Sequence, residues 1–480
     1  MPSKDIREFI ALLEKKGHLQ RISQEVDWNL EAGAISRRGC ELKLPAILFE
    51  KLKDYPTGYR LLANPLATFS RLALAMGLPE DTPYTELVEQ YLHRSTQLIK
   101  PIQVKDGPCK EEIYKAEEVN LLKFPVPLIH EGDGGRYLGT WHLVVTKDPD
   151  SGWVNWGMYR QMVLDKTSLG GIFVPFQHGP MQYYQKYEAR NKPMPFATCI
   201  GVDPLSTLAA CNPVEYGVNE VEVAGGLRGE PIELVQCETV DLLVPAHSEI
   251  VIEGEVLPKE RREEGPFGEY TGYMAGGRAP RPVYRVKAIT HRKDPILTMS
   301  NMGVPIDDCD ISNSIGFGAR LTGELRRKGV PIRGTVCLIP QCSLFVAVVS
   351  VKVPYAGIAH QIASTIWADK AGVFTPYVVV CDEDVDPSNV DEVLHTIATR
   401  CHPTRGIMTF PQSTGNPLNP FSDLHERTYA KAPKCLLDCT WPVDWPKEAI
   451  PKKVSFETIY PEEIKERVLS NWFQYGFKKE

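Results

Sequence analysis

The stretch of the chain most suggestive of chemistry is residues 263–273, in which Glu264-Gly-Pro-Phe-Gly-Glu269 sets two glutamates around a turn of glycine and proline. Glycine and proline in this arrangement predict a tight loop with a fixed backbone, from which both carboxylates would project. Two carboxylates held close together raise the pKa of one of them, so that a protonated acid is available near neutral pH. The pattern indicates a general acid, although an ordinary acidic turn with solvated glutamates has the same composition.

A second group of candidates lies earlier in the chain, where Asn155 and Arg160 are five positions apart and are followed by Gln177, His178 and Glu220. Arginine is a planar donor fork that can hold a carboxylate, and an asparagine carbonyl oxygen is a ligand for a hard cation. Oxygen ligands with one imidazole suit Mg²⁺ or Mn²⁺ better than Zn²⁺. Polar residues on an exposed strand face would give the same pattern, so the residues alone leave these roles open.

Other patterns argue against common alternatives. The twelve cysteines contain no CxxC pair, which favours reduced, buried thiols over a zinc site. The run Gly316–Gly323 lacks the third glycine of a dinucleotide-binding fingerprint. The acidic run Asp382–Asp386 is more typical of a strand end followed by a helix cap than of a metal loop.

Composition and charge exclude several classes of protein. The 480 residues are 43% hydrophobic and 24% charged, which is typical of globular proteins, and the length predicts about three domains. The net charge of −7, with no basic block, argues against nucleic-acid binding. No apolar run approaches the roughly 18 residues of a membrane span. Charged residues at positions 4–8 replace the apolar region of a signal peptide, so a cytoplasmic protein without a membrane partner is expected.

The periodicity of the chain predicts three domains. Residues 1–100 should form a small N-terminal α/β domain, with an amphipathic helix that is capped by Ser3 and ends near Gly17, and a buried strand at Pro45–Phe49. Residues 101–127 resemble a connector. Residues 115–320 should form a barrel or curled sheet. Its expected elements are a hairpin of His142–Thr146 with Trp153–Tyr159 and the strands Phe196–Val202, Glu249–Val256 and Val283–Ile289.

The last third of the chain alternates strand and helix. Ser343–Val351 and Tyr377–Cys381 are predicted strands, and Gly357–Ala368 and Val390–Arg400 are predicted helices. This alternation is typical of βαβ units around a mostly parallel sheet. Residues 330–480 should therefore form a C-terminal α/β domain, with a tail that docks on a neighbour.

Together, the candidate residues resemble a known family in order and spacing. Asn155, Arg160, His178, Glu220, Glu264 and Glu269 are similar to the pattern of the UbiD family of decarboxylases, which use prenylated FMN, and in particular to its phenolic and aromatic acid decarboxylases. The similarity covers nearly the whole chain. It implies a small N-terminal α/β domain, a central split β-barrel that binds the flavin, and a C-terminal α/β domain used in oligomerisation.

The resemblance also implies roles for individual residues. Arg160, Glu264 and Glu269 would be catalytic, with Glu269 as the proton donor. Mn²⁺, accompanied by K⁺, would be bound by Asn155, His178 and Glu220. Many members have a phosphate-contacting lysine where this chain has His360. The residues expected to contact the cofactor are Asn155, Trp156, Gly157, Met158, Tyr159, Arg160, Gln177, His178, Glu220 and His360.

The activity implied by the resemblance is the reversible, non-oxidative decarboxylation of an aromatic, heteroaromatic or conjugated carboxylic acid. Loss of CO₂ from an sp² carbon leaves an electron pair that no side chain can accept, so a cofactor must act as the electron sink. The expected partners are the acid, CO₂, a flavin prenyltransferase that supplies the cofactor, and further copies of the chain in a dimer or hexamer. The alternatives are a flavin-binding subunit of a multi-component aromatic carboxylase, inactive alone, and an FMN oxidoreductase, for which no nicotinamide fingerprint is found.

Overall fold

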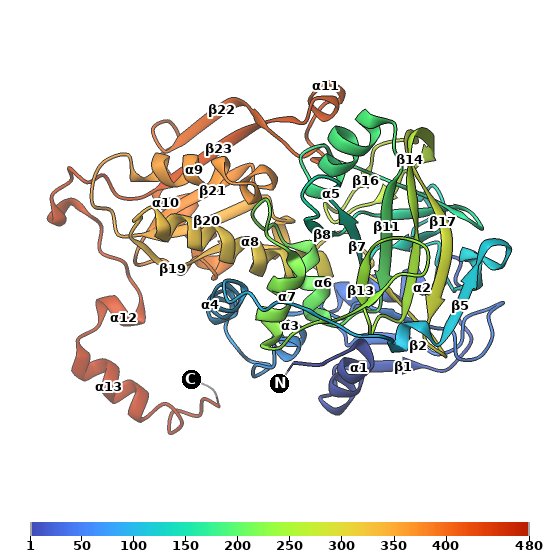
Figure 1. The fold of residues 1–480 in the computed structure, drawn as a ribbon. Coiled ribbons are helices and arrows are strands. Elements are labelled where there is room, and N and C mark those ends of the chain that lie inside the picture. The colour runs from blue at the N-terminus through green and yellow to red at the C-terminus, as the bar shows by residue number, and fades with distance from the viewer. Residues whose placement is uncertain (1, 479–480) are drawn as a thin grey trace.

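The computed structural model describes residues 2–478, which fold into three parts with their own sheets (Figure 1). The N-terminal part begins with α1 (Ile6–Lys15), whose apolar stripe is buried as predicted. Asp5 rather than Ser3 caps this helix, since its carboxylate accepts a hydrogen bond from the Glu8 backbone N–H at 2.8 Å. The sheet beside α1 has the order β1-β2-β3-β18, built from Leu19–Ile22, Ala46–Phe49, Arg60–Ala63 and Ile296–Met299.

Strand β18 comes from far beyond the predicted domain boundary. It pairs in parallel with β3, so that Ile296 lies opposite Arg60 and Met299 opposite Ala63. The N-terminal sheet is therefore completed by a strand that leaves the central part of the chain. Local periodicity cannot reveal such a pairing, because it reports the type of an element and not its neighbour.

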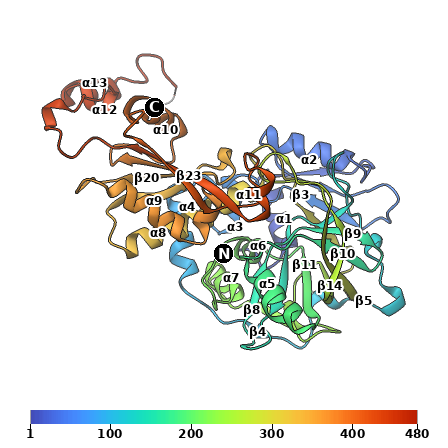
Figure 2. The same cartoon turned by 90° about the horizontal axis from the view of Figure 1, so that it is seen from above.

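The central part is one nine-stranded antiparallel sheet that curls on itself (Figures 1 and 2). Its order is β6-β9-β10-β17-β14-β11-β7-β8, with β5 paired to β17. Among the described residues no pairing joins β6 to β8, so the expected split barrel is an open, curled sheet. The strands are Glu112–Lys115 (β5), Tyr137–Gly139 (β6), His142–Lys147 (β7), Val154–Gly157 (β8), Gln161–Asp165 (β9), Ser168–Gly171 (β10), Met194–Ile200 (β11), Ile250–Glu264 (β14) and Ala279–His291 (β17).

Two features of this sheet position the candidate residues. The predicted hairpin is present as β7 and β8, with Val144 opposite Gly157, and it carries Asn155. The long strand β14 ends at Glu264, directly before the glycine-proline turn. Helices α5 (His178–Met181), α6 (Pro204–Cys211) and α7 (Glu220–Arg228) lie beside the β7–β8 edge, and His178 and Glu220 are the first residues of α5 and α7.

The C-terminal part contains the predicted mostly parallel sheet. Its order is β19-β20-β21-β23-β22, in which β20, β21 and β23 are parallel and the two edge strands are antiparallel. Helices α8 (Asp308–Arg327) and α9 (Ile358–Ala368) pack on one face, and α10 (Val390–Arg400) packs on the other. The strands are Ile332–Leu338 (β19), Val346–Val351 (β20), Tyr377–Asp382 (β21), Ile407–Thr414 (β22) and Lys431–Cys439 (β23).

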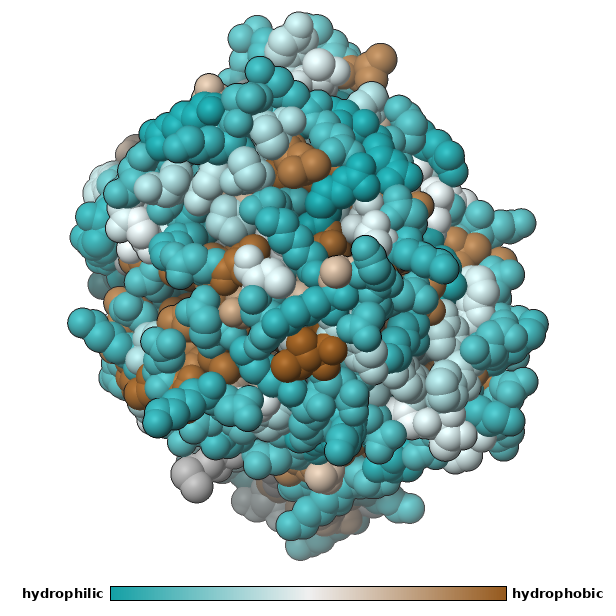
Figure 3. Space-filling view, turned by 45° about the vertical axis from the view of Figure 1, so that its right-hand side comes forward, coloured by the Kyte–Doolittle hydropathy of each residue, from teal (hydrophilic) through white to brown (hydrophobic). Residues whose placement is uncertain are grey.

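The chain beyond β23 projects from the C-terminal part as an arm (Figures 1 and 2). Its helices α12 (Phe456–Ile459) and α13 (Glu462–Ser470) contain no buried residue. Lys453 pairs with Glu392 of α10 and fixes the start of the arm. Elsewhere the visible surface is mainly hydrophilic, with apolar side chains in small separate groups (Figure 3). Within residues 2–478, no helix combines the length and apolarity needed to span a bilayer.

Candidate active site

The structure brings Arg160 together with Glu264 and Glu269. Arg160 holds Glu264 through two parallel bonds, from Nε to Oε1 and from Nη2 to Oε2, each 3.0 Å long. The remaining guanidinium nitrogen, Nη1, donates to Glu269 Oε1. The Tyr137 hydroxyl donates to Glu264 Oε1 at 2.7 Å, which further fixes that carboxylate. One guanidinium therefore braces two acids that are 104 and 109 residues away in the chain.

Burial decides the electrostatics of this network. Arg160, Glu264 and Glu269 are 9%, 1% and 5% exposed. Burial raises the pKa of Glu269 above its usual value, and the negative charge of Glu264 adds to this effect, while Arg160 opposes it. For Arg160, burial alone would lower the pKa, but the charges of Glu269 and Glu264 outweigh it and the pKa rises. The guanidinium thus stays charged, and Glu269 is the group closer to a change of protonation.

The glycine-proline turn keeps the two glutamates in place. Gly265 has a φ of +87°, which a residue with a side chain adopts only with strain. A Cβ at Gly134 would lie 2.0 Å from the Gly265 carbonyl oxygen, so the loop before β6 packs directly on the turn. Asp133 accepts a hydrogen bond from the Gly268 backbone N–H at 2.9 Å. The acidic turn is therefore buried and braced, which excludes the alternative of solvated glutamates.

The second group of candidate residues lies around one cavity with Tyr159 and consists of Asn155, His178 and Glu220. All three line one small cavity of about 90 Å³, and all three side chains are buried. The Tyr159 hydroxyl lies 3.3 Å from Asn155 Nδ2 and 3.0 Å from the Gly179 backbone N–H, so it ties β8 to α5. His178 Nδ1 and Glu220 Oε1 are 3.9 Å apart, too far for a hydrogen bond but close enough to share a ligand.

The same cavity holds the other predicted cofactor contacts except Arg160, which lines the second cavity described below, and His360. Trp156, Gly157, Met158, Tyr159 and Gln177 all line it. His360 does not: it is exposed on α9, and its Nε2 contacts Met408 Sδ.

The cation at this cavity is instead Lys370, a residue that sequence analysis missed. Burial lowers the pKa of Lys370 to about 8, and no carboxylate among residues 2–478 lies within salt-bridge distance of it. The phosphate contact of His360 therefore stays a prediction, and His360 does not line this cavity. Lys370 lies two residues after α9 ends, where helical spacing gives no signal.

A second cavity joins the two groups of residues. It measures about 150 Å³, is lined by Arg160 and Glu269, and shares Met158, Tyr159 and Gln177 with the first cavity. The segments 299–309 and 411–421 contribute Met302, Cys309, Asn416 and Leu418 to its walls. Arg160 and Glu269 thus face a cavity that shares part of its lining with the cavity of Asn155, His178 and Glu220.

Family models match all three parts of the chain. They are the N-terminal, Rift-related and C-terminal domains of 3-octaprenyl-4-hydroxybenzoate carboxy-lyase, at residues 10–91, 100–305 and 312–439. The chain belongs to the UbiD family of carboxy-lyases.

Relatives and solved structures of this UbiD carboxy-lyase match it over nearly its full length. It is 34% identical to the pyrrole-2-carboxylic acid decarboxylase of Pseudomonas aeruginosa over 98% of both chains. It is 31% identical to ferulic acid decarboxylase 1 of Saccharomyces cerevisiae over 99% of both. The closed form of vanillic acid decarboxylase from Sedimentibacter hydroxybenzoicus aligns with a TM-score of 0.88 at 31% identity, over 99% of this chain and 100% of that one. HmfF from Pelotomaculum thermopropionicum, solved with FMN, aligns with a TM-score of 0.82 at 33% identity over 94% and 97%.

Proposed function

We propose that this UbiD carboxy-lyase catalyses the reversible, non-oxidative decarboxylation of an aromatic, heteroaromatic or conjugated carboxylic acid with prenylated FMN. The observation that carries the proposal is the buried network in which Arg160 holds both Glu264 and Glu269 at one cavity. Its relatives act on acids of this class, among them pyrrole-2-carboxylic and ferulic acid.

The residues at the small cavity fit the phosphate end of a flavin and its metal ion. Asn155 offers an amide oxygen, Glu220 a carboxylate and His178 an imidazole, a donor set that suits Mn²⁺. Among residues 2–478, no cluster of three His, Cys, Asp or Glu side chains could hold a metal. The proposed set has only two side chains of these types, His178 and Glu220, because its third member is the amide of Asn155. Lys370 adds a cation without a carboxylate partner, which fits a phosphate. K⁺ would accompany Mn²⁺ there.

The chain's own residues would then do three things. Prenylated FMN, when bound, supplies the electron sink for the pair left by CO₂. Arg160 fixes the positions of both carboxylates, so that the acid keeps one geometry toward the substrate carbon. Glu269, whose pKa is raised by burial, transfers its proton to the carbon that lost CO₂, and it takes the proton back in the carboxylation direction. The apolar walls of the cavity keep water from that carbon.

A second candidate function is a flavin-binding subunit of a multi-component aromatic carboxylase, inactive alone. It is favoured by one neighbour, the vanillic acid decarboxylase ShVdcCD, which was solved with truncated ShVdcD. We also propose a homo-oligomer, dimer or hexamer, because the arm of α12 and α13 has no buried residue in one copy. An evolved form of HmfF is dimeric.

The experiment is a substrate screen with the single purified chain, co-expressed with a flavin prenyltransferase. We expect the chain to bind prenylated FMN and Mn²⁺, and to release CO₂ from at least one acid in a panel of phenolic, heteroaromatic and cinnamic acids. Release by the chain alone would eliminate the accessory-subunit alternative. If the loaded chain converts none of these acids, the proposal of a self-sufficient enzyme is wrong.

A further inference from the structure

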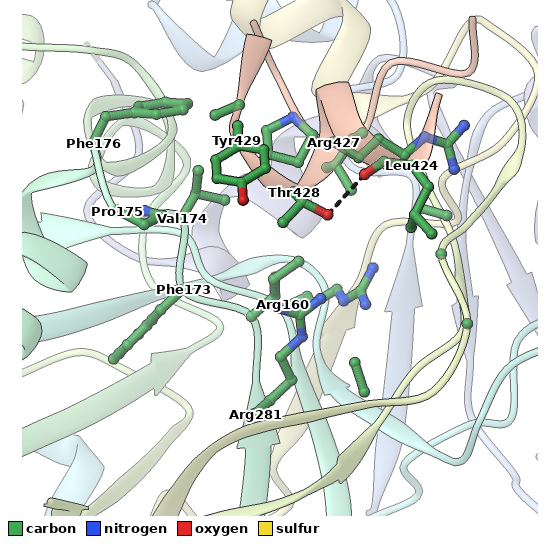
Figure 4. A pocket seen from close by; sticks show the side chains of 18 of the residues that line it. Arg160, Phe173, Val174, Pro175, Phe176, Arg281, Leu424, Arg427, Thr428 and Tyr429 are labelled. Atoms are coloured by element: carbon green, nitrogen blue, oxygen red, sulfur yellow. Dashed lines mark hydrogen bonds between the residues drawn. The ribbon is translucent and has the colours of Figure 1, made fainter. Parts of the chain in front are cut away.

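A large cavity lies outside the one that holds Glu269. It measures about 1100 Å³ and separates the central sheet from residues 417–430, the segment between β22 and β23 that contains α11 (Leu424–Thr428) (Figure 4). We call it the outer cavity. Arg160, Ile172, Val174 and Leu418 line both the outer cavity and the inner cavity of about 150 Å³. The outer cavity is therefore an antechamber to the proposed active site.

Three arginines in the outer cavity have no acidic partner. Arg278, Arg281 and Arg427 line it, and no Asp or Glu among residues 2–478 does so. Within residues 2–478, the Arg278 guanidinium donates only to the Gly134 carbonyl oxygen at 3.1 Å, and the Arg427 guanidinium only to the Pro420 carbonyl oxygen at 3.0 Å. The Nε atoms of Arg281 and Arg427 are buried and have no hydrogen-bond acceptor in the described part of the chain.

Figure 4 shows how these cations are placed. Arg160 and Arg281 lie on the wall formed by the central sheet, while Arg427, Thr428 and Tyr429 lie on the facing wall. Arg160 is neutralised by two glutamates, but Arg281 and Arg427 carry their charge into the cavity unopposed. The rest of the lining is largely apolar or aromatic, including Phe173, Phe176, Met181, Tyr184 and Leu424.

Such a cavity fits an anion that carries an apolar ring. An arginine with unfilled donors binds a carboxylate through two hydrogen bonds, and aromatic walls bind the ring. The chain as a whole has a net charge of −7, which repels an approaching carboxylate. A local positive potential inside a cavity with low-dielectric walls reverses this repulsion at the entrance.

We propose that Arg281 and Arg427 form a capture site for the carboxylate of the incoming acid, before the acid reaches Arg160 and Glu269. This inference rests on the proposed function only in that the substrate is an aromatic carboxylate. Arg281 and Arg427 are binding residues in this account and take no part in proton transfer. They raise the association rate of the acid, whereas the inner cavity sets the chemistry.

The test is binding of benzoate, an anion, and of benzamide, its neutral analogue, to the cofactor-free protein in stopped-flow and calorimetric measurements. In the double variant Arg281→Gln/Arg427→Gln we expect the association rate and the affinity for benzoate to fall about 10-fold, with benzamide unchanged. Arg281→Lys/Arg427→Lys keeps the charge and should recover most of the rate. Arg327→Gln removes one positive charge from an exposed site on α8 that does not line the cavity, and should change the binding of neither ligand.

A measurement on the unaltered protein guards against misfolded variants. Benzoate binding to the wild-type chain should weaken steadily between 50 and 200 mM NaCl, a range over which screening shortens the reach of charges, while benzamide binding should not change. Two results would overturn the capture site. One is an equal loss of affinity for benzoate and benzamide in the Gln variant, and the other is benzoate binding that changes neither with salt nor with the substitutions. Because these ligands are not decarboxylated, this result is independent of whether the substrate screen succeeds.

Discussion

The two ends of the proposed active site differ in how their charges are compensated. At the acid end, Arg160 is bonded to both Glu264 and Glu269, so the cation and the anions compensate one another within the chain. At the cofactor end, Lys370 has no carboxylate within salt-bridge distance among residues 2–478, and His178 and Glu220 stand 3.9 Å apart without a hydrogen bond. The acid end is therefore complete in the folded chain, whereas the cofactor end is completed by what binds there.

This difference separates what each set of substitutions should do. Changes at the acid end should lower the free energy of unfolding of the chain itself, because they expose buried charges without partners. Changes at the cofactor end should lower ligand affinity and leave the cofactor-free protein nearly as stable.

The largest effect is expected from Arg160→Met. It leaves two buried carboxylates without their cation and should lower the free energy of unfolding by about 3–5 kcal/mol, measured by urea titration of the cofactor-free protein. Arg327→Met, at a side chain that is 70% exposed, should change it by no more than about 0.5 kcal/mol. If both variants unfold at the same urea concentration, the network does not contribute to stability as described.

The next effect concerns the metal. Glu220→Ala should weaken Mn²⁺ binding by more than the roughly 10–100-fold that follows loss of an outer partner, because a direct ligand is lost. Electron paramagnetic resonance of Mn²⁺ added to the cofactor-free chain measures this. Glu222→Ala is the matched control, because it removes a carboxylate from the same helix α7 that accepts a hydrogen bond from Asn219. Equal Mn²⁺ affinity in the two variants would remove Glu220 from the ligand set.

A smaller effect is expected at Lys370. A hydrogen bond to a charged group contributes roughly 1.5–3 kcal/mol, so Lys370→Met should weaken FMN binding by about 10-fold or more. Riboflavin, which lacks the phosphate, should bind equally to both proteins. Lys352→Met, at an exposed lysine of the C-terminal part, should leave FMN binding unchanged. A parallel loss of riboflavin binding would mean that Lys370 supports the cavity rather than the phosphate.

The smallest effect is a pH dependence at the acid end. Burial raises the pKa of Glu269 in the native state. At pH values between the ordinary pKa and this raised pKa, the native chain keeps a proton on Glu269 that the unfolded chain has lost. The free energy of unfolding of the wild type should therefore fall as the pH rises through that window. In Glu269→Gln this contribution is missing, so urea titrations from pH 4.5 to 8 should show a shallower fall. An equally steep fall in both proteins would refute a raised pKa at this position.

Much of the fold could be predicted from the sequence because it depends on local patterns. The apolar stripe of α1, the β7–β8 hairpin and the strand-helix alternation of the C-terminal part are each determined within short windows. The pairing of β18 with β3 could not be predicted, because it joins residues more than 230 positions apart. The order of the strands in the central sheet escaped prediction for the same reason.

Site residues could be predicted where a local motif or their order along the chain identifies them. They could not be predicted where their role depends on the geometry of the folded chain. Glu264 and Glu269 were found because the turn between them is local, and Arg160 because the family pattern includes it. Lys370 was missed because it lies after the end of α9, where helical spacing does not single it out, and nothing in the sequence shows that His360 is exposed. The unpaired state of Arg281 and Arg427 is a property of the folded surface and has no signature in the chain.

The most direct test of the account compares two neighbouring glutamates in the loaded enzyme. Glu269 is buried and bonded to Arg160, whereas Glu263 is exposed and lies in β14 directly before Glu264. With an acid that the wild type converts, Glu269→Gln should lower the rate of product formation by about 10²-fold or more, and Glu263→Gln should leave it unchanged. Full turnover by Glu269→Gln would contradict the claim that this carboxyl group supplies the proton.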